Sequence, residues 1–131
     1  MILVDTSVLI DFFKGAKNTG SRKFREILRQ DIPFGISSVI FMEVLQGAGS
    51  DEEYHLIKTH LETQRFYHLK DPIASFARAA KIYMECRQRG IIVRSTIDCL
   101  IVQTVLEHNL FLLHNDGDFN KIARLFPMKF Y

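Results

Sequence analysis

The sequence has little cysteine, proline or glycine and no tryptophan: its 131 residues include 2 Cys, 3 Pro and 7 Gly. Cys86 and Cys99 show no CxxC spacing, and each lies in a segment with helical apolar periodicity. A disulfide framework and a cysteine-ligated zinc site are therefore not expected, and both thiols are predicted to be reduced and structural. No linker or internal repeat divides the chain, which predicts one domain over residues 1–131.

Long hydrophobic runs are also absent. No stretch approaches the roughly 20 apolar residues of a membrane span. Residues 1–5 are too short and too soon charged for a signal peptide. We therefore expect a soluble, cytoplasmic protein that does not contact a membrane.

Neither sign of charge dominates, because 17 Lys and Arg face 15 Asp and Glu for a formal net charge of +2. This balance by itself says nothing about partners. The five histidines show no HxxxH or HExxH spacing, so a histidine metal site or histidine base is not expected. Several acids, in contrast, occupy informative positions.

The chain does contain short apolar runs that alternate with amphipathic segments. Strands are predicted over residues 2–4, 33–36, 66–69, 110–113 and 128–130. Helices are predicted from Val8 to Phe13, Arg22 to Gln30, Ser37 or Ser38 to Gly47, Asp51 to Gln64, Pro72 to Arg89, Ser95 or Thr96 to His108, and Phe119 to Leu125. This alternation predicts an α/β fold with a mainly parallel sheet.

Four acids lie at the borders of apolar segments. Asp5 and Asp116 come just past predicted strands, and the carboxyl ends of parallel strands meet at one edge of a sheet. Glu43 continues the apolar stripe of its helix, and Asp98 stands at the head of such a stripe. The sequence thus predicts that four carboxylates point inward, some of them toward a shared crevice.

Clustered, buried carboxylates need protonation or cations, because burial and mutual repulsion both disfavour the ionised form. Carboxylate oxygens are the ligands that Mg²⁺ and Mn²⁺ prefer, and such ions activate water. When the four acids are set aside as metal-neutralised, eleven acids remain against 17 bases, a balance of +6. That balance suits a polyanionic substrate.

Each acid also has a structural alternative that the sequence leaves open. Asp5 could cap the following helix, and Asp116 could belong to a turn. Asp98 forms an S-x-x-D pattern with Ser95, close to a capping box. Glu43 lies in mid-helix, where neither role applies, and its alternative is a buried salt bridge to an arginine.

Four sequence blocks occur in order over nearly the whole chain: VDTSVLID at residues 4–11, EVLQG at 43–47, TIDCLI at 96–101 and LHNDGDF at 113–119. Together they resemble the PIN-domain ribonucleases, and among these the VapC-type toxins. The resemblance implies a PIN-like three-layer α/β/α fold and an Mg²⁺- or Mn²⁺-dependent endoribonuclease whose nucleophile is a metal-bound water. It also implies a cognate VapB-type antitoxin and a homodimer.

By position, the resemblance gives the catalytic and metal-binding roles to Asp5, Glu43, Asp98 and Asp116, with Asp118 as a further metal-binding acid. It leaves open which of Asp116 and Asp118 binds metal directly, and whether one ion binds or two. Thr6 and Asn115 are expected near the substrate. His114 departs from the family, where many members carry a hydroxyl residue, and this affects the hydrogen bonding around Asn115.

Basic and apolar side chains add two surface hypotheses. Arg94 precedes the helix of Asp98, where a guanidinium could bind a substrate phosphate or pair with an acid. A basic helix, with Arg22, Lys23, Arg25 and Arg29, could line an RNA groove or simply face solvent. Six apolar residues could contact the antitoxin or belong to the core: Phe24, Ile27, Leu28, Phe41, Val44 and Leu45.

Two other functions are weighed against a nuclease. An aspartyl-phosphate phosphatase needs a second acid two residues after Asp5, where this chain has Ser7. A non-catalytic PIN-fold module that binds RNA or regulates a partner stays open, because a sequence shows ligands but not turnover. Asp11 is given no catalytic role and is expected to face solvent or cap locally.

Overall fold

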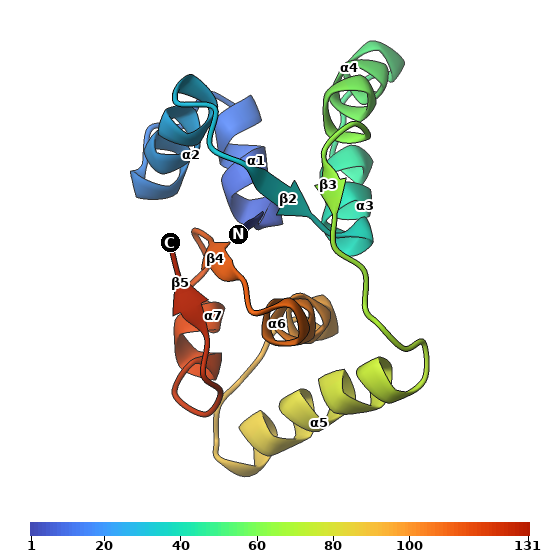
Figure 1. The fold of residues 1–131 in the computed structure, drawn as a ribbon, viewed down its shortest axis with the longest axis vertical. Coiled ribbons are helices and arrows are strands. Elements are labelled where there is room, and N and C mark those ends of the chain that lie inside the picture. Colours follow the sequence, from blue (N-terminus) through green and yellow to red (C-terminus); the bar gives the residue numbers. More distant parts are fainter.

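The computed structural model describes all 131 residues, and its strands and helices alternate along the chain (Figure 1). The strands are β1 (Ile2–Val4), β2 (Phe34–Ile36), β3 (Arg65–Phe66), β4 (Phe111–Leu113) and β5 (Lys129–Phe130). The helices are α1 (Thr6–Phe13), α2 (Thr19–Arg29), α3 (Ser38–Gln46), α4 (Asp51–Leu61), α5 (Ala74–Gln88), α6 (Thr96–His108) and α7 (Gly117–Ile122). The predicted α/β class is confirmed.

All five strands form one sheet in the order β3-β2-β1-β4-β5, and every pair is parallel. The central strand, β1, places Leu3 opposite Gly35 on one side and opposite Leu112 on the other. The chain runs outward from β1 to β3 and then crosses back to the far side of β1. The carboxyl end of β1 is therefore the switch point at which parallel α/β sheets characteristically bind ligands.

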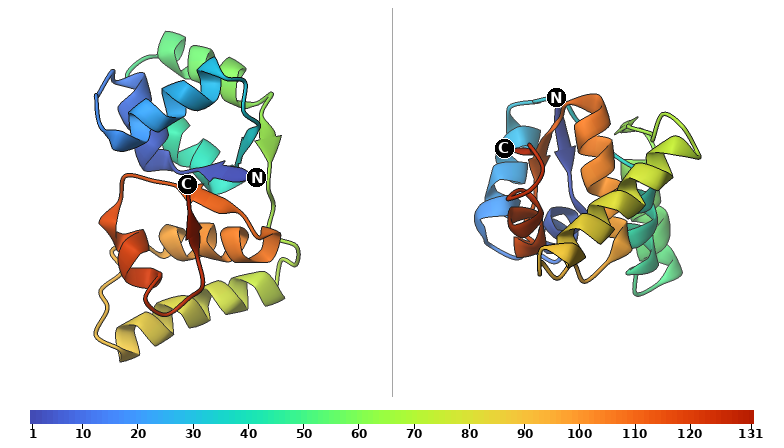
Figure 2. Two further views of the ribbon diagram at one scale, coloured as in Figure 1. Left: turned by 60° about the vertical axis from the view of Figure 1, so that its left-hand side comes forward. Right: turned by 90° about the horizontal axis from the view of Figure 1, so that it is seen from below.

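Helices cover both faces of the sheet. Helices α1 to α4 lie on one side of the strands, and α5, α6 and α7 lie on the other (Figures 1 and 2). Right-handed crossovers explain this division, because the connection direction reverses after β3. Leu3, Val4, Ile36 and Leu112 are completely buried, as expected of strands covered on both faces. The three-layer α/β/α architecture is confirmed.

Side-chain caps explain three helix starts that were predicted too late. Helix α1 begins at Thr6 rather than Val8, because the Asp5 carboxylate accepts the Ser7 N–H. Helix α2 begins at Thr19 rather than Arg22, because Asn18 and Ser21 form a reciprocal capping box. Helix α7 begins at Gly117 rather than Phe119, because the Asp116 carboxylate accepts the Asp118 N–H.

Two boundaries between β3 and α5 also differ from the prediction. Strand β3 comprises Arg65–Phe66 instead of residues 66–69, because its partner β2 ends at Ile36, opposite Phe66. Helix α5 begins at Ala74 rather than Pro72. The Asp71 carboxylate accepts the N–H groups of Ile73 and Ala74 and so holds a turn before the helix.

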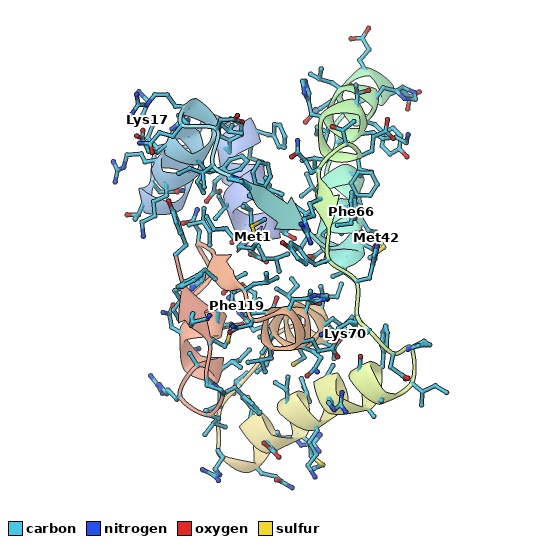
Figure 3. All side chains as sticks on the ribbon, in the orientation of Figure 1. Met1, Lys17, Met42, Phe66, Lys70 and Phe119 are labelled. Atoms are coloured by element: carbon cyan, nitrogen blue, oxygen red, sulfur yellow. The ribbon has the colours of Figure 1, made fainter.

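Most of the apolar residues offered as a partner surface belong to the core instead. Phe24, Ile27, Val44 and Leu45 are buried, whereas Leu28 is 45% exposed. Met42, on the outer side of α3, is 50% exposed (Figure 3).

No helix combines the length and the apolar character needed to cross a membrane.

Candidate active site

Five carboxylates come together at the carboxyl edge of the sheet. Asp5 follows β1, Glu43 lies on α3, Asp98 lies in the first turn of α6, and Asp116 and Asp118 stand at the start of α7. One carboxylate oxygen from each of Asp98, Asp116 and Asp118 lies within 4.8 Å of the others. Burial, and to a lesser extent repulsion from the four other acids, raises the pKa of Asp98 to about 7. Asp98 is therefore the electrostatic centre of the cluster.

Asp5 is buried and caps α1. Its Oδ2 accepts the Ser7 N–H at 3.0 Å and the Ser7 hydroxyl at 2.6 Å. The capping role foreseen for Asp5 is thus real, but it uses one carboxylate oxygen and leaves Oδ1 as a potential ligand. The pKa of Asp5 is raised to about 6, because burial and the charge of nearby Glu43 together outweigh the opposing Ser7 hydrogen bonds.

Glu43 is positioned by a hydroxyl group. The buried Thr6 donates its hydroxyl hydrogen to Glu43 Oε1 at 2.7 Å. No arginine or lysine pairs with Glu43, so the alternative of a buried salt bridge is wrong. A neutral donor fixes this carboxylate without cancelling its charge.

Asp98 has no protein partner at all. Ser95 caps α6 by accepting the Ile97 N–H at 3.2 Å, but the Asp98 carboxylate makes no reciprocal bond. No cation lies within ion-pair distance of it. The capping-box alternative therefore leaves the half-buried Asp98 carboxylate unexplained.

Asp116 and Asp118 are instead paired with cations. Arg94 donates from Nε to Asp118 Oδ2 at 2.9 Å and from Nη2 to Asp116 Oδ1 at 3.1 Å. Lys121 Nζ lies 3.6 Å from Asp118 Oδ1. Burial favours the neutral form of Asp118, but its bonds and attraction to Arg94 outweigh this effect and hold its pKa below the usual range.

Sequence comparison assigns the family. The model of the PIN domain matches residues 2–125. The chain is 32% identical over 126 residues to the VapC ribonuclease Mb1587 of Mycobacterium bovis and to ribonuclease VapC11 of Mycobacterium tuberculosis. These alignments cover 95% of this chain and 93% of each relative. The chain belongs to the PIN domain family.

Solved structures share the fold of this PIN domain. A toxin-antitoxin complex from Klebsiella pneumoniae matches 98% of this chain and 99% of its own, with a TM-score of 0.69 and 23% identity. VapBC2 from Rickettsia felis, bound to a DNA fragment from its promoter, matches 100% and 98%, with a TM-score of 0.71 and 18% identity. At these identities the likeness establishes the fold alone.

The donor set of this PIN domain fits a hard divalent cation. Every candidate ligand is a carboxylate oxygen, and no thiol or imidazole belongs to the cluster. Mg²⁺ and Mn²⁺ favour such oxygens and complete their octahedral shell with water. The uncompensated Asp98, between acids on both sides, is where a cation would relieve the greatest repulsion.

Asn115 lies beside the acids, and its exposed side chain is hydrogen-bonded within the protein. Its amide donates to Asp11 Oδ2 and Asn18 Oδ1, each at 2.9 Å, and accepts the Gly20 N–H at 3.1 Å. A Cβ at Gly20 would collide with the Asn115 side chain, so this close approach requires glycine. We call this group of four residues the Asn115 clamp.

The hydrogen bonds around Asn115 correct one expectation and reveal one site residue that the sequence analysis missed. Asp11 lies within α1 and accepts hydrogen bonds from Asn18 and Asn115, so the expectation that it faces solvent or caps locally is wrong. Ser7 was also overlooked, although its hydroxyl bridges Asp5 and the Asn115 N–H. Its place two residues after a strand-ending acid was the one available signal in the sequence.

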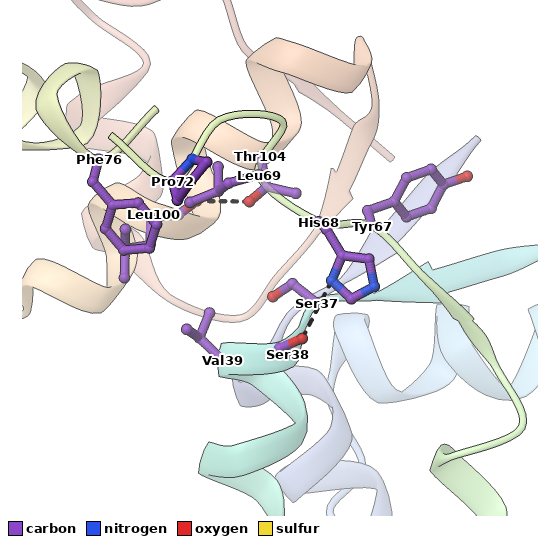
Figure 4. A pocket seen from close by; sticks show the side chains of 10 residues that line it. All are labelled: Ser37, Ser38, Val39, Tyr67, His68, Leu69, Pro72, Phe76, Leu100 and Thr104. Atoms are coloured by element: carbon purple, nitrogen blue, oxygen red, sulfur yellow. Dashed lines mark hydrogen bonds between the residues drawn. The ribbon is translucent and has the colours of Figure 1, made fainter. Parts of the chain in front are cut away.

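A pocket of about 250 Å³ lies elsewhere, between the start of α3, the segment after β3, α5 and α6 (Figure 4). Ser38 Oγ and His68 Nδ1 approach to 3.4 Å there. No Asp or Glu lines the pocket, so this pair lacks the third group of a catalytic triad. The acidic cluster is therefore the better candidate for catalysis.

Proposed function

We propose that this PIN domain is an endoribonuclease that hydrolyses RNA phosphodiester bonds with Mg²⁺ or Mn²⁺ held by Asp5, Glu43, Asp98, Asp116 and Asp118. The observation that carries the proposal is the unpaired carboxylate of Asp98 at the centre of four other acids. The two mycobacterial relatives named as ribonucleases support the RNA substrate. The same relatives and the toxin-antitoxin neighbours support a role as a toxin.

Two groups of acids would bind the ion from opposite sides. Asp5, Glu43 and Asp98 would present oxygens from the end of β1, from α3 and from α6, and Asp116 and Asp118 would close the other side. When bound, the ion would lower the pKa of a coordinated water and neutralise charge on the phosphate. Thr6 and Ser7 would keep Glu43 and Asp5 aimed at the ion, as supporting hydrogen bonds do in metal sites.

Cationic side chains would hold the substrate, and the Asn115 clamp would order the loop beside it. The side chain of Arg94 is 72% exposed, so its guanidinium can reach a phosphate in solvent. Asn115 would act through the loop that carries Asp116, since its amide hydrogen bonds are used within the protein. Exposed Arg22, Lys23 and Arg25 on α2 would extend the attraction for the RNA backbone.

We also propose a cognate VapB-type antitoxin as a partner and a homodimer as the assembly. Support for the antitoxin comes from the similar solved structures, which include a toxin-antitoxin complex and VapBC structures. The dimer rests on the family resemblance alone. Light scattering of the purified chain, with and without the antitoxin, would give both stoichiometries.

The central test uses protein freed of any partner and incubated with mixed RNA. Cleavage is expected with Mg²⁺ or Mn²⁺, and none is expected with EDTA or with an Asp5→Asn variant. Equal RNA loss in all samples would refute a metal-dependent nuclease. Metal-dependent RNA binding without cleavage would instead identify a non-catalytic module.

A further inference from the structure

Charge is unevenly distributed within the acidic cluster. Arg94 and Lys121 are its two paired cations, and both contact only Asp116 and Asp118. No cation pairs with the other three acids. Asp5 accepts hydrogen bonds from the Ser7 N–H and hydroxyl, Glu43 accepts one from the Thr6 hydroxyl, and the Asp98 carboxylate accepts none. One side of the cluster is thus already neutralised by the protein, and the other is not.

Arg94 binds one oxygen of each of two carboxylates that a metal would also use. Its Nε and its backbone N–H both point at Asp118 Oδ2, at 2.9 and 3.4 Å, and its Nη2 reaches Asp116 Oδ1. Asp116 and Asp118 are two of the three residues whose oxygens converge within 4.8 Å, the third being Asp98. Because a guanidinium and a divalent cation repel each other, the two cannot both bind Asp116 and Asp118 strongly.

Little in the fold prevents the Arg94 side chain from moving away from Asp116 and Asp118. Residues 91–95 form neither helix nor strand, and the side chain is 72% exposed, so no packing beyond the two acids holds it. Lys121, by contrast, is tied to Asp118 at i,i+3 on the same short helix. Only Arg94 can give up its acids without disturbing an element of the fold.

We propose that Arg94 is a displaceable internal counter-ion: it neutralises Asp116 and Asp118 in the metal-free protein and is released when Asp98, Asp116 and Asp118 take up a divalent cation. The released guanidinium then becomes available to a substrate phosphate. The proposal rests on the proposed function insofar as the cluster binds metal. It adds that metal binding and Arg94 compete for the same two carboxylates, Asp116 and Asp118.

The first test compares Mn²⁺ and Mg²⁺ binding by calorimetry in the wild type, Arg94→Gln and Lys121→Gln. Removing the competitor is expected to tighten metal binding by roughly three- to tenfold in Arg94→Gln. Lys121→Gln, which also removes one positive charge, is expected to change it less than twofold. Unchanged or weaker binding by Arg94→Gln, or an equal gain in both variants, would overturn the proposal.

The second test observes Arg94 directly. In NMR spectra of the metal-free protein, the Arg94 Nε–H signal, assigned by its loss in Arg94→Gln, is expected at a hydrogen-bonded position. Saturation with diamagnetic Mg²⁺ is expected to shift it toward the values of free arginine. A signal that stays in place while Mg²⁺ binds would show that Arg94 is not displaced.

Failure of this proposal and failure of the proposed function give different results. If the wild type binds no divalent cation, both are wrong. If it binds metal and cleaves RNA, but Arg94→Gln binds metal no more tightly, only the counter-ion role is wrong. Thermal unfolding of each metal-free variant identifies misfolded samples. Arg94→Lys keeps the positive charge but loses the two-pronged guanidinium. Its metal affinity is expected to lie between those of the wild type and Arg94→Gln.

Discussion

The two sides of the acidic cluster are built differently, although both consist of carboxylates at one edge of the same sheet. On the side of β1 and α3, Asp5 and Glu43 are fixed by the hydroxyls of Ser7 and Thr6. On the side of α7, Asp116 and Asp118 are fixed by the cations Arg94 and Lys121. Asp98 stands between them with no partner.

The difference teaches how a protein can keep a site folded and still able to bind a cation. Hydroxyl donors orient a carboxylate and leave its charge available, whereas a guanidinium orients it and cancels the charge. The β1 side therefore retains the greater attraction for metal. The α7 side is stable without metal but must exchange its cation to bind one.

The largest expected effect follows from removing the centre of the cluster. Asp98→Asn keeps the shape of the side chain but removes its charge, and it should lower the rate of RNA cleavage on the order of a thousandfold. The variant should unfold at the same or a higher temperature without metal, because repulsion is relieved. Cleavage of a fluorogenic RNA and a thermal melt measure both effects. Wild-type activity in this variant would remove Asp98 from the site.

A second prediction concerns the Asn115 clamp, which anchors the loop on the α7 side. Gly20→Ala forces a Cβ against Asn115 and should destabilise the protein by about 1–3 kcal/mol, even though Ala favours helices. Gly117→Ala is the matched control, because nothing lies within 4 Å of its added Cβ. Urea unfolding compares the two. Equal stability of both variants would show that the close approach of Gly20 and Asn115 does not require glycine.

The hydroxyl side gives a smaller effect. Thr6→Val preserves shape but loses the donor to Glu43, and it should weaken metal affinity or cleavage about tenfold. Thr6→Ser keeps the hydroxyl and should retain most of both. Calorimetry with Mn²⁺ and a cleavage assay provide the readouts. Identical behaviour of the valine and serine variants would separate Thr6 from the function of Glu43.

The smallest expected effect is on the pH dependence of the metal-free protein. The folded-state pKa values of Asp98 and Asp5, about 7 and about 6, lie above the ordinary 3.8. Their stabilising contribution is therefore complete below pH 3.8 and is lost as pH rises through these folded values. With EDTA, the melting temperature should fall by roughly 5 °C between about pH 5 and pH 8.

Two controls accompany the pH experiment. Asp98→Asn should flatten the profile, because the group with the larger shift is gone. Saturating Mg²⁺ should restore stability at the higher pH, since the ion binds the ionised carboxylates. A wild-type melting temperature that rises with pH in EDTA would contradict the burial and repulsion assigned to Asp98.

Much of the fold was readable in the sequence. The run Ile2–Val4 and the apolar residues before His114 mark β1 and β4, because strands covered on both faces need uninterrupted apolar side chains. Helix starts were less predictable. The capping box of Asn18 and Ser21 consists of two common polar residues, whose pattern alone does not distinguish a cap from a loop.

The candidate acids could also be found from the sequence, because local apolar patterns reveal them. A carboxylate on an apolar stripe, as with Glu43, conflicts with burial unless something offsets it, and this conflict is visible in one helix at a time. The partners of those acids were not visible. The Asn115 contacts with Asp11 and Gly20 join residues 104 and 95 positions apart, and no local periodicity encodes them.

The sequence by itself determined the alternation of elements, the apolar strands and the identities of the acids, because each depends on neighbouring residues and on burial. Only the tertiary structure decided how those acids are balanced. The same chemical group has no partner at Asp98, is oriented by Thr6 at Glu43 and is neutralised by Arg94 at Asp118. Electrostatic energy depends on distances and solvent exposure between distant segments, and these exist only once the chain has folded.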